Sequence, residues 1–243
     1  MNRMKCNGDG LMMYQKLYRC FWVLLITLAS CSGLEDPFNE NNRAVAVENH
    51  ADGAMQQALE QILQWHREHT TGIPDALQPG LSRADILEKF EDLPCRPTEE
   101  LIQLWSWHDG VETASTPFIW YHDFLPLDKA VATYKRFTIN RLTGLGWKRN
   151  WIPVFEFEGE WYFTECYDEV RPAGPVGYLF IEETRTYYSY LNLTRMMQTQ
   201  AEWLRQGMIS WNYGTEAMEE NIQEMAEVYR KLNEGAEFPY NVE

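Results

Sequence analysis

The residues with the most obvious chemical potential are histidines and the acids beside them. Two histidines lie three residues apart in the segment His66–His69, and His108 is followed by Asp109. Two imidazoles on neighbouring helical turns can share a metal ion, but the segment matches neither HExxH nor HxxEH. The pair His108 and Asp109 could exchange a proton, yet it ends a predicted helix, where His suits the dipole and Asp-Gly is a stop signal. We therefore expect structural roles, no cofactor and no metal, with a metal-dependent hydrolase using His66, His69 or His108 as a remote alternative.

No glycine-rich phosphate loop, nucleophile elbow or CxxC pair occurs in the 243 residues. The formal charge is -15, and residues 1–30 contribute +3, which leaves -18 on the rest. So acidic a chain is repelled by nucleic acid and by anionic lipid headgroups. The acidity either favours a basic protein partner or only keeps the protein soluble.

Export is predicted by the first 30 residues, which read as a signal peptide. Lys16 and Arg19 precede a short apolar run at residues 21–30, too short for a spanning helix of ~20 residues. The tetrapeptide Leu28–Cys31 resembles a bacterial lipobox, and the resemblance implies cleavage before Cys31 and lipidation of its thiol. An ordinary secretory signal is the alternative. Translation from Met12 or Met13 instead of Met1 would leave this interpretation unchanged.

Four regions follow from composition. Residues 1–30 are the signal peptide, 31–50 the lipidated cysteine with a polar tether, 51–212 the main domain, and 213–243 a C-terminal helix and tail. A flexible tether of that length reaches ~25 Å. We expect a lipoprotein of the bacterial envelope, held on the inner or the outer membrane.

Hydrophobic periodicity predicts an α+β fold, with a mostly antiparallel mixed sheet and helices packed against it. Helices are expected at residues 51–70, 82–93, 98–108, 127–137, 193–207 and 215–232. Strands are expected at residues 117–121, 152–157, 161–167, 176–181 and 186–190. The last four strands form a meander within residues 151–190. We expect the final helix to dock on the domain, with pairing to another chain as the alternative.

After processing, two cysteines remain besides Cys31. Cys95 lies between predicted helices and Cys166 lies in a predicted strand. They could pair in an oxidising envelope, but we favour two buried thiols because nothing in the sequence brings them together.

A partner surface is predicted on the sheet, where acids crowd the first hairpin of the meander. Like charges across strands destabilise a sheet, so this crowding suggests a use, namely contact with a basic surface through acids and aromatic anchors. The candidate residues are Trp120, Tyr121, His122, Asp123, Glu156, Glu158, Glu160, Trp161, Glu165, Asp168 and Glu169. The alternative is that the aromatics are core and the acids are a solvated face.

Several short motifs follow one another along the chain. They are Leu77–Ser82 (LQPGLS), Trp107–Gly110 (WHDG), Leu125–Asp128 (LPLD), Trp151–Val154 (WIPV) and Gly174–Val176 (GPV). In this order and spacing, residues from about 77 to 207 resemble the SUKH superfamily, in particular its Smi–Knr group. Leu193 opens the helix that corresponds to the family's "Ser–Leu" helix, although Asn192 replaces the usual Ser.

The resemblance implies an α+β fold and a non-enzymatic binding role. Bacterial members of the superfamily are largely immunity proteins that neutralise toxins by binding them. They are mostly cytosolic, so the predicted lipoprotein signal is a departure that favours a toxin acting in the envelope over one acting on nucleic acid. An envelope scaffold or cell-wall-associated module is the alternative function.

Overall fold

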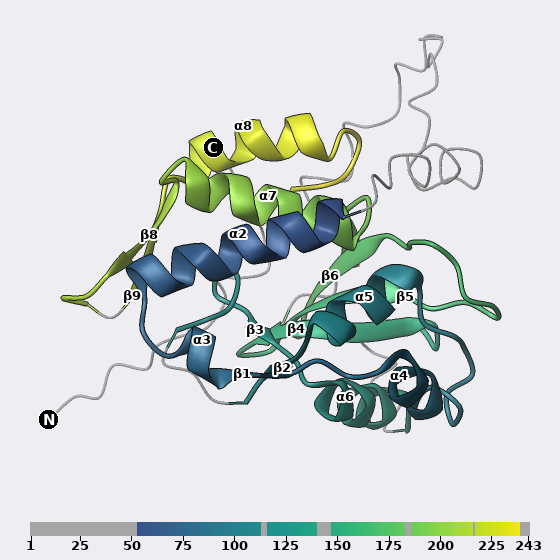
Figure 1. Cartoon of the computed structure of the whole chain (residues 1–243). Coiled ribbons are helices and arrows are strands. Elements are labelled where there is room, and N and C mark those ends of the chain that lie inside the picture. Colours follow the sequence, from purple (N-terminus) through teal and green to yellow (C-terminus); the bar gives the residue numbers. More distant parts are fainter. Residues whose placement is uncertain (1–52, 113–115, 140–146, 183–185, 216, 239–243) are drawn as a thin grey trace, which may run out of the picture. The chain divides into compact units, whose positions relative to one another are not determined.

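The computed structural model describes residues 53–112, 116–139, 147–182, 186–215 and 217–238. These residues form an α+β fold around a five-stranded antiparallel sheet of order β3-β4-β5-β6-β7 (Figure 1). The predicted fold class is therefore confirmed. The predicted signal peptide, lipidation site and tether lie outside the described residues.

The predicted meander is present as four consecutive strands. They are β4 (Trp151–Phe157), β5 (Glu160–Glu165), β6 (Val176–Phe180) and β7 (Thr186–Tyr190). The strand expected at 117–121 is wrong. The backbone turns instead at Trp120 and Tyr121, with Tyr121 at φ 60°, and the edge strand is β3 (Asp123–Phe124). This tight turn stops the aromatic run from extending as a strand.

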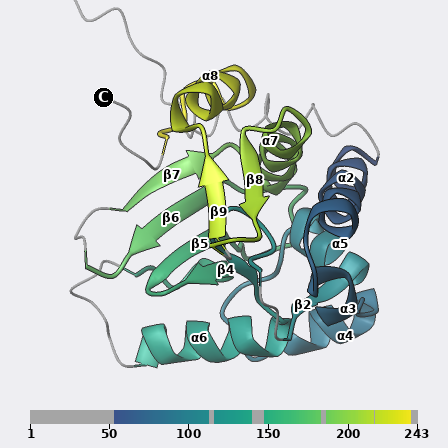
Figure 2. The same cartoon turned by 90° about the vertical axis from the view of Figure 1, so that its left-hand side faces the viewer.

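Each face of the sheet packs against helices (Figure 2). One face, with Tyr162 and Tyr178, joins the main core beneath α2 (Ala54–His69), α5 (Glu99–Trp107) and α7 (Leu193–Arg205). The other face, with Trp161, packs against Phe137 of α6 (Leu127–Ile139). Aromatic side chains on both faces are thereby removed from water, which supplies most of the stabilisation of such a sheet.

Helix capping follows the sequence signals. Ser82 accepts the N–H of Asp85 and starts α4 (Arg83–Lys89), as its capping pattern predicts. Thr98 and Asn192 cap α5 and α7 in the same way. These caps determine the residue at which each helix begins.

Two motifs of the SUKH resemblance contact one another. Asp109 Oδ1 accepts the N–H of Leu127, 2.7 Å away, at the start of α6. Gly110, at φ 73°, lies so close to Pro126 that a Cβ would come within 2.2 Å of its nitrogen. Gly110 was expected to stop the preceding helix, but α5 ends at Trp107 and Gly110 belongs to β2 (His108–Val111). β2 pairs with β1 (Leu77–Pro79), which follows the short helix α3 (Ile73–Ala76).

The C-terminal region differs from the predicted single helix at 215–232. A hairpin comes first, made of β8 (Ile209–Asn212) and β9 (Ala217–Glu220), and only then α8 (Ile222–Leu232). The Asn212 side chain accepts the N–H groups of Gly214 and Thr215 and so builds the turn. The boundary expected between residues 212 and 213 falls inside this hairpin. α8 docks on the domain, with Met225 and Tyr229 buried in the main core.

Cys95 and Cys166 form a disulfide, with Cα atoms 5.5 Å apart. The two buried thiols that we favoured are therefore wrong. The reason is a backbone pairing that the sequence does not reveal: Arg96 and Tyr167, which directly follow the two cysteines, form an antiparallel bridge that holds the two segments together. The bond ties the segment between α4 and α5 to the end of β5.

Candidate functional site

Four of the predicted contact residues gather at one end of the sheet, and we call them the acidic edge. They are Asp123, Glu156, Glu158 and Glu160. Asp123 on β3 is the direct cross-strand neighbour of Glu156 on β4. Glu158 occupies the β4–β5 turn, and Glu160 begins β5. The side chains of Asp123 and Glu158 are exposed, and those of the other two are half-buried.

Two further acids on the candidate set lie elsewhere. Asp168 and Glu169 are exposed but follow the opposite end of β5, ~17 Å from Glu160 at 3.3 Å per strand residue. Glu165, at that same end, is 5% exposed and accepts hydrogen bonds from the hydroxyls of Tyr167 and Tyr188. The structure thus divides the predicted acidic surface into two separate groups.

Trp120, His122 and Trp161 are at most 5% exposed. Their predicted role as anchors that a partner touches directly is wrong, and the alternative of core packing holds. Trp120 packs edge-on to Trp203, with ring centroids 5.7 Å apart, and Trp161 packs edge-on to Phe137. Because both faces of the sheet are covered, period-two alternation does not separate exposed from buried aromatics here.

Tyr121 is the one predicted aromatic that remains half-buried. Its hydroxyl donates to Glu220 at 2.8 Å. Burial and then this carboxylate raise the pKa of Tyr121 to about 12. Glu220 therefore adds a fifth carboxylate beside the acidic edge. Glu220 was not among the predicted contact residues because its sequence predicts a helix, whereas it lies in β9.

Two half-buried phenylalanines lie on either side of Glu160 at this end of the sheet. In strand register, Phe157 of β4 and Phe180 of β6 lie directly on either side of Glu160. The ring of Phe157 is 5.7 Å from that of Tyr121. Phe157 shares parity with the buried Phe155 and was not among the predicted contact residues. The available signal was its place next to the turn.

The like charges of the edge interact. Burial raises the pKa of Asp123, and the neighbouring Glu156 raises it further, while Lys129 lowers it. Cross-strand like charges of this kind destabilise by ~0.2–1 kcal/mol. A cation placed over the edge would relieve that repulsion.

His122 lies beneath Glu160. Its Nδ1 is 2.8 Å from the carbonyl oxygen of Trp120, and its Nε2 is 3.7 Å from Glu160 Oε2. Burial lowers the pKa of His122 to about 4. The imidazole is therefore neutral at pH 7, and the contact with Glu160 is not an ion pair there.

Backbone strain is concentrated at the same place. Among the described residues, Tyr121 (φ 60°) and Glu158 (φ 42°) are the two non-glycine residues with positive φ. Such conformations cost ~1–3 kcal/mol and cluster at functional sites. Glu158 lies between Phe157 and Glu160 in the chain, and Tyr121 packs against Phe157. This concentration of strain marks this end of the sheet as the candidate site.

The histidines that suggested a metal site are each bonded to a different backbone carbonyl. His66 binds Phe118 at 2.8 Å, His69 binds Trp65 at 2.9 Å, and His108 binds Gln78 at 2.8 Å. Burial lowers the pKa of His66 to about 4. In the described part of the chain, no three His, Cys, Asp or Glu side chains are grouped closely enough to hold a metal ion.

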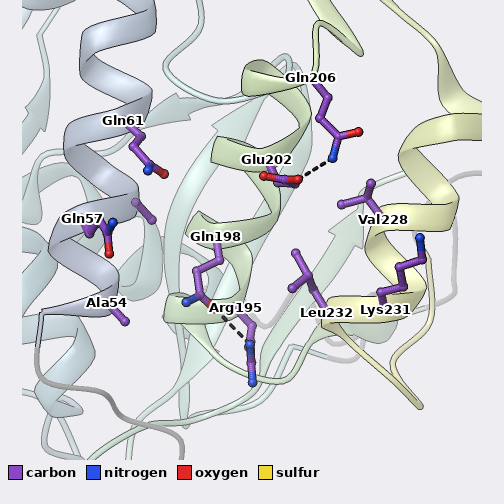
Figure 3. Close-up of a pocket in the computed structure, with 11 residues that line it drawn as sticks. Ala54, Gln57, Gln61, Arg195, Gln198, Glu202, Gln206, Val228, Lys231 and Leu232 are labelled. Carbon is purple, nitrogen blue, oxygen red and sulfur yellow. Dashed lines mark hydrogen bonds between the residues drawn. The ribbon is translucent and has the colours of Figure 1, made fainter.

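A groove of about 400 Å³ lies on the helical layer, with α7 as its floor between α2 and α8 (Figure 3). Its polar lining is mostly amide and includes Gln57, Gln61, Gln198 and Gln206. Arg195 donates to Gln198 at 3.2 Å, and Gln206 donates to Glu202. No predicted contact residue lines this groove.

Comparison with known proteins adds no relative. No protein-family model matches the chain, and no curated protein matches it. Within the described residues, every helix is too short or too polar to cross a bilayer.

Proposed function

We propose that this chain is a lipid-anchored, non-enzymatic binding protein with a SUKH-like domain, and that it neutralises a basic toxin domain by stoichiometric binding at the acidic edge. The observation that carries the proposal is the gathering of Asp123, Glu156, Glu158 and Glu160 at one end of the sheet, where aromatic residues are also half-buried. Negative potential on such a surface speeds the encounter with a basic partner and selects against acidic ones.

Aromatic groups at the acidic edge add apolar contact area to the charge of its carboxylates. Tyr121, Phe157 and Phe180 are each half-buried, so part of each ring is available to a partner. Aromatic side chains at the centre of an interface commonly dominate its binding energy. Charge and apolar area together fit a protein partner better than a small ion.

The disulfide between Cys95 and Cys166 supports the proposed compartment. Structural disulfides persist in oxidising environments and are rare in the cytosol. A bonded pair in the domain agrees with export directed by residues 1–30 and with anchoring through Cys31. A toxin met there would act on the envelope.

The proposed SUKH relation is supported by the contacts between its motifs. Asp109 accepts the first helical N–H of α6, and Gly110 lies against Pro126. Motifs that meet in space have a structural reason to recur together. His108 and Asp109 therefore have structural roles, which agrees with a binding protein rather than with an enzyme that uses them as an acid–base pair.

The test is neutralisation of a toxin-like product encoded by a neighbouring gene, and the absence of such a gene would refute immunity. The purified full chain should form a 1:1 complex with that toxin and protect cells, with inhibition complete at one equivalent. A double variant, Glu158→Gln with Glu160→Gln, should lose most of the protection.

Asp168→Asn with Glu169→Gln is the matched control, because it removes two charges at the far end of β5. It should protect as the wild type does. Equal loss in both double variants would show that net charge alone matters. A toxin that kills cells carrying the wild-type chain, or a mutant with an altered cell wall and unaltered toxin resistance, would refute immunity.

A further inference from the structure

The groove on the helical layer carries the opposite charge to the acidic edge. Of the described residues that line it, Glu202 is the one acid, and Arg195 and Lys231 are the cations. Arg205 donates to both carboxylate oxygens of Glu202, at 2.6 and 2.7 Å, and these bonds lower the pKa of Glu202. The two cations have no carboxylate partner in the described part of the chain. In a chain of formal charge -15, this groove therefore favours an anionic ligand.

Two glutamines on the floor of the groove present opposite hydrogen-bonding groups. Arg195 can only donate, so the carbonyl oxygen of Gln198 faces it at 3.2 Å, and the amino group of Gln198 remains available. Ionised Glu202 can only accept, so the amino group of Gln206 faces it, and the carbonyl of Gln206 remains available. The floor thus offers a donor and an acceptor whose orientations are set by neighbouring charged side chains.

The α2 wall adds two more amides. Gln57 and Gln61 are one helical turn apart, so both project from the same face of α2 toward the groove (Figure 3). Both are exposed, and neither side chain is bonded to another described residue. Each amide carries donors and an acceptor, as a peptide group does. Apolar surface from Ala58, Val228 and Leu232 completes a lining that matches a peptide with small side chains.

The size of the groove and the position of Arg195 limit the ligand. The volume of about 400 Å³ falls in the ~300–1,000 Å³ range of small-ligand sites. Half-buried Arg195 lies in the first turn of α7, at the same end of the groove as Ala54, the first residue of α2 (Figure 3). Its guanidinium has five N–H donors, so most remain for a carboxylate after the bond to Gln198. No aromatic side chain lines the groove within the described residues, so a nucleobase would have no ring to stack on.

We propose that this groove binds a short peptide through its free C-terminal carboxylate and its backbone amides. The carboxylate accepts N–H groups of Arg195, and Lys231 adds attraction from α8. The peptide groups that precede the carboxylate pair with the glutamine amides of α2 and α7. This second site goes beyond the proposed function, because it shares no residue with the acidic edge and takes a ligand of the opposite charge.

N-acetyl-trialanine, as the free acid and as the C-terminal amide, tests the site by NMR titration of the full chain. The acid should bind ~10-fold tighter than the amide, because hydrogen bonds between charged groups are stronger than neutral ones. Arg195→Gln should remove this preference and leave binding of the amide unchanged. Arg230→Gln is the matched control, since it removes the same charge from an exposed position of α8 that does not line the groove. It should keep the preference for the acid.

The double variant Gln57→Ala with Gln61→Ala tests recognition of the backbone. Alanine is the best helix former, so α2 should be retained. Both peptides should bind ~5-fold more weakly to this variant, with the preference for the acid unchanged. Undiminished binding to the double variant, or equal binding of acid and amide to the wild type, would overturn the proposal. Equal losses in Arg195→Gln and Arg230→Gln, or binding of adenosine monophosphate as tight as that of the acid peptide, would overturn it as well.

Discussion

Glu100 makes the stability of this protein depend on pH in a direction unusual for an acid. It is 0% exposed, and its oxygens accept the backbone N–H groups of Leu193 and Thr194 at 3.1 and 3.0 Å, at the start of α7. Burial outweighs these bonds and raises its pKa from an ordinary 4.5 to about 7. Because the folded pKa exceeds the unfolded one, the stabilising effect is complete below pH 4.5 and is lost as the pH rises through 7.

At ~1.4 kcal/mol per pKa unit, the full effect is ~3 kcal/mol. Glu100→Gln cannot ionise, so its stability relative to the wild type should rise by ~3 kcal/mol between pH 4.5 and pH 8. Urea denaturation at intervals across that range measures the difference. Protonation of the buried His66 and His122 on unfolding is common to both proteins and cancels in the comparison.

Glu99→Gln is the matched control at the adjacent position. Glu99 pairs with Arg83 at 2.6 Å on the surface, which lowers its pKa. Its removal should therefore give a small pH-dependent change of the opposite sign. A stability difference between Glu100→Gln and the wild type that stays constant with pH would refute the reasoning.

Three further predictions concern the disulfide between Cys95 and Cys166, the β4–β5 turn and the proposed lipid anchor at Cys31. Cys95→Ala should lower the free energy of unfolding by ~4 kcal/mol, which is the chain-entropy value for a loop with a sequence separation of 71. In thermal unfolding, reduction should destabilise the wild type by a matching amount and should not destabilise the variant further. Glu158→Asn should stabilise the fold by ~0.5–1 kcal/mol, because Asn suits the positive φ of the β4–β5 turn, while slowing association with the basic partner; a destabilised variant in urea denaturation would contradict this. Cys31→Ala should move the protein from the membrane to the soluble fraction with unchanged thermal unfolding, and a variant that stays on membranes would exclude the lipobox.

The elements that sequence reasoning placed correctly are those with a strong local pattern. The stripe of α2, the Ser82 cap of α4 and the four meander strands are encoded in residues close together along the chain. The hairpin β8–β9 was missed because Met218 also fits a helical stripe with Met225 and Tyr229. Its true partner is Trp211 across the turn, a contact that helical periodicity does not show.

The site was predicted in part for a related reason. Charge is visible in a sequence, so Asp123, Glu156, Glu158 and Glu160 were found. Burial is a tertiary property, so the positions of Trp120 and Trp161 were not. The covering elements, α6 on one face and α7 on the other, come from distant parts of the chain. The disulfide was unpredictable on the same grounds, since the Arg96–Tyr167 bridge joins segments that only the folded sheet brings together.

The acidic edge is less stable than the fold requires, and this is the strongest argument for its use. An asparagine at position 158 would suit the turn, and a neutral residue opposite Asp123 would remove the repulsion. The chain instead places two positive-φ residues, paired like charges and an unsatisfied imidazole within one end of one sheet. A cationic group beside Asp123 and Glu156 would offset the repulsion between these two carboxylates. Local penalties gathered at one end of a sheet are typical of a functional surface.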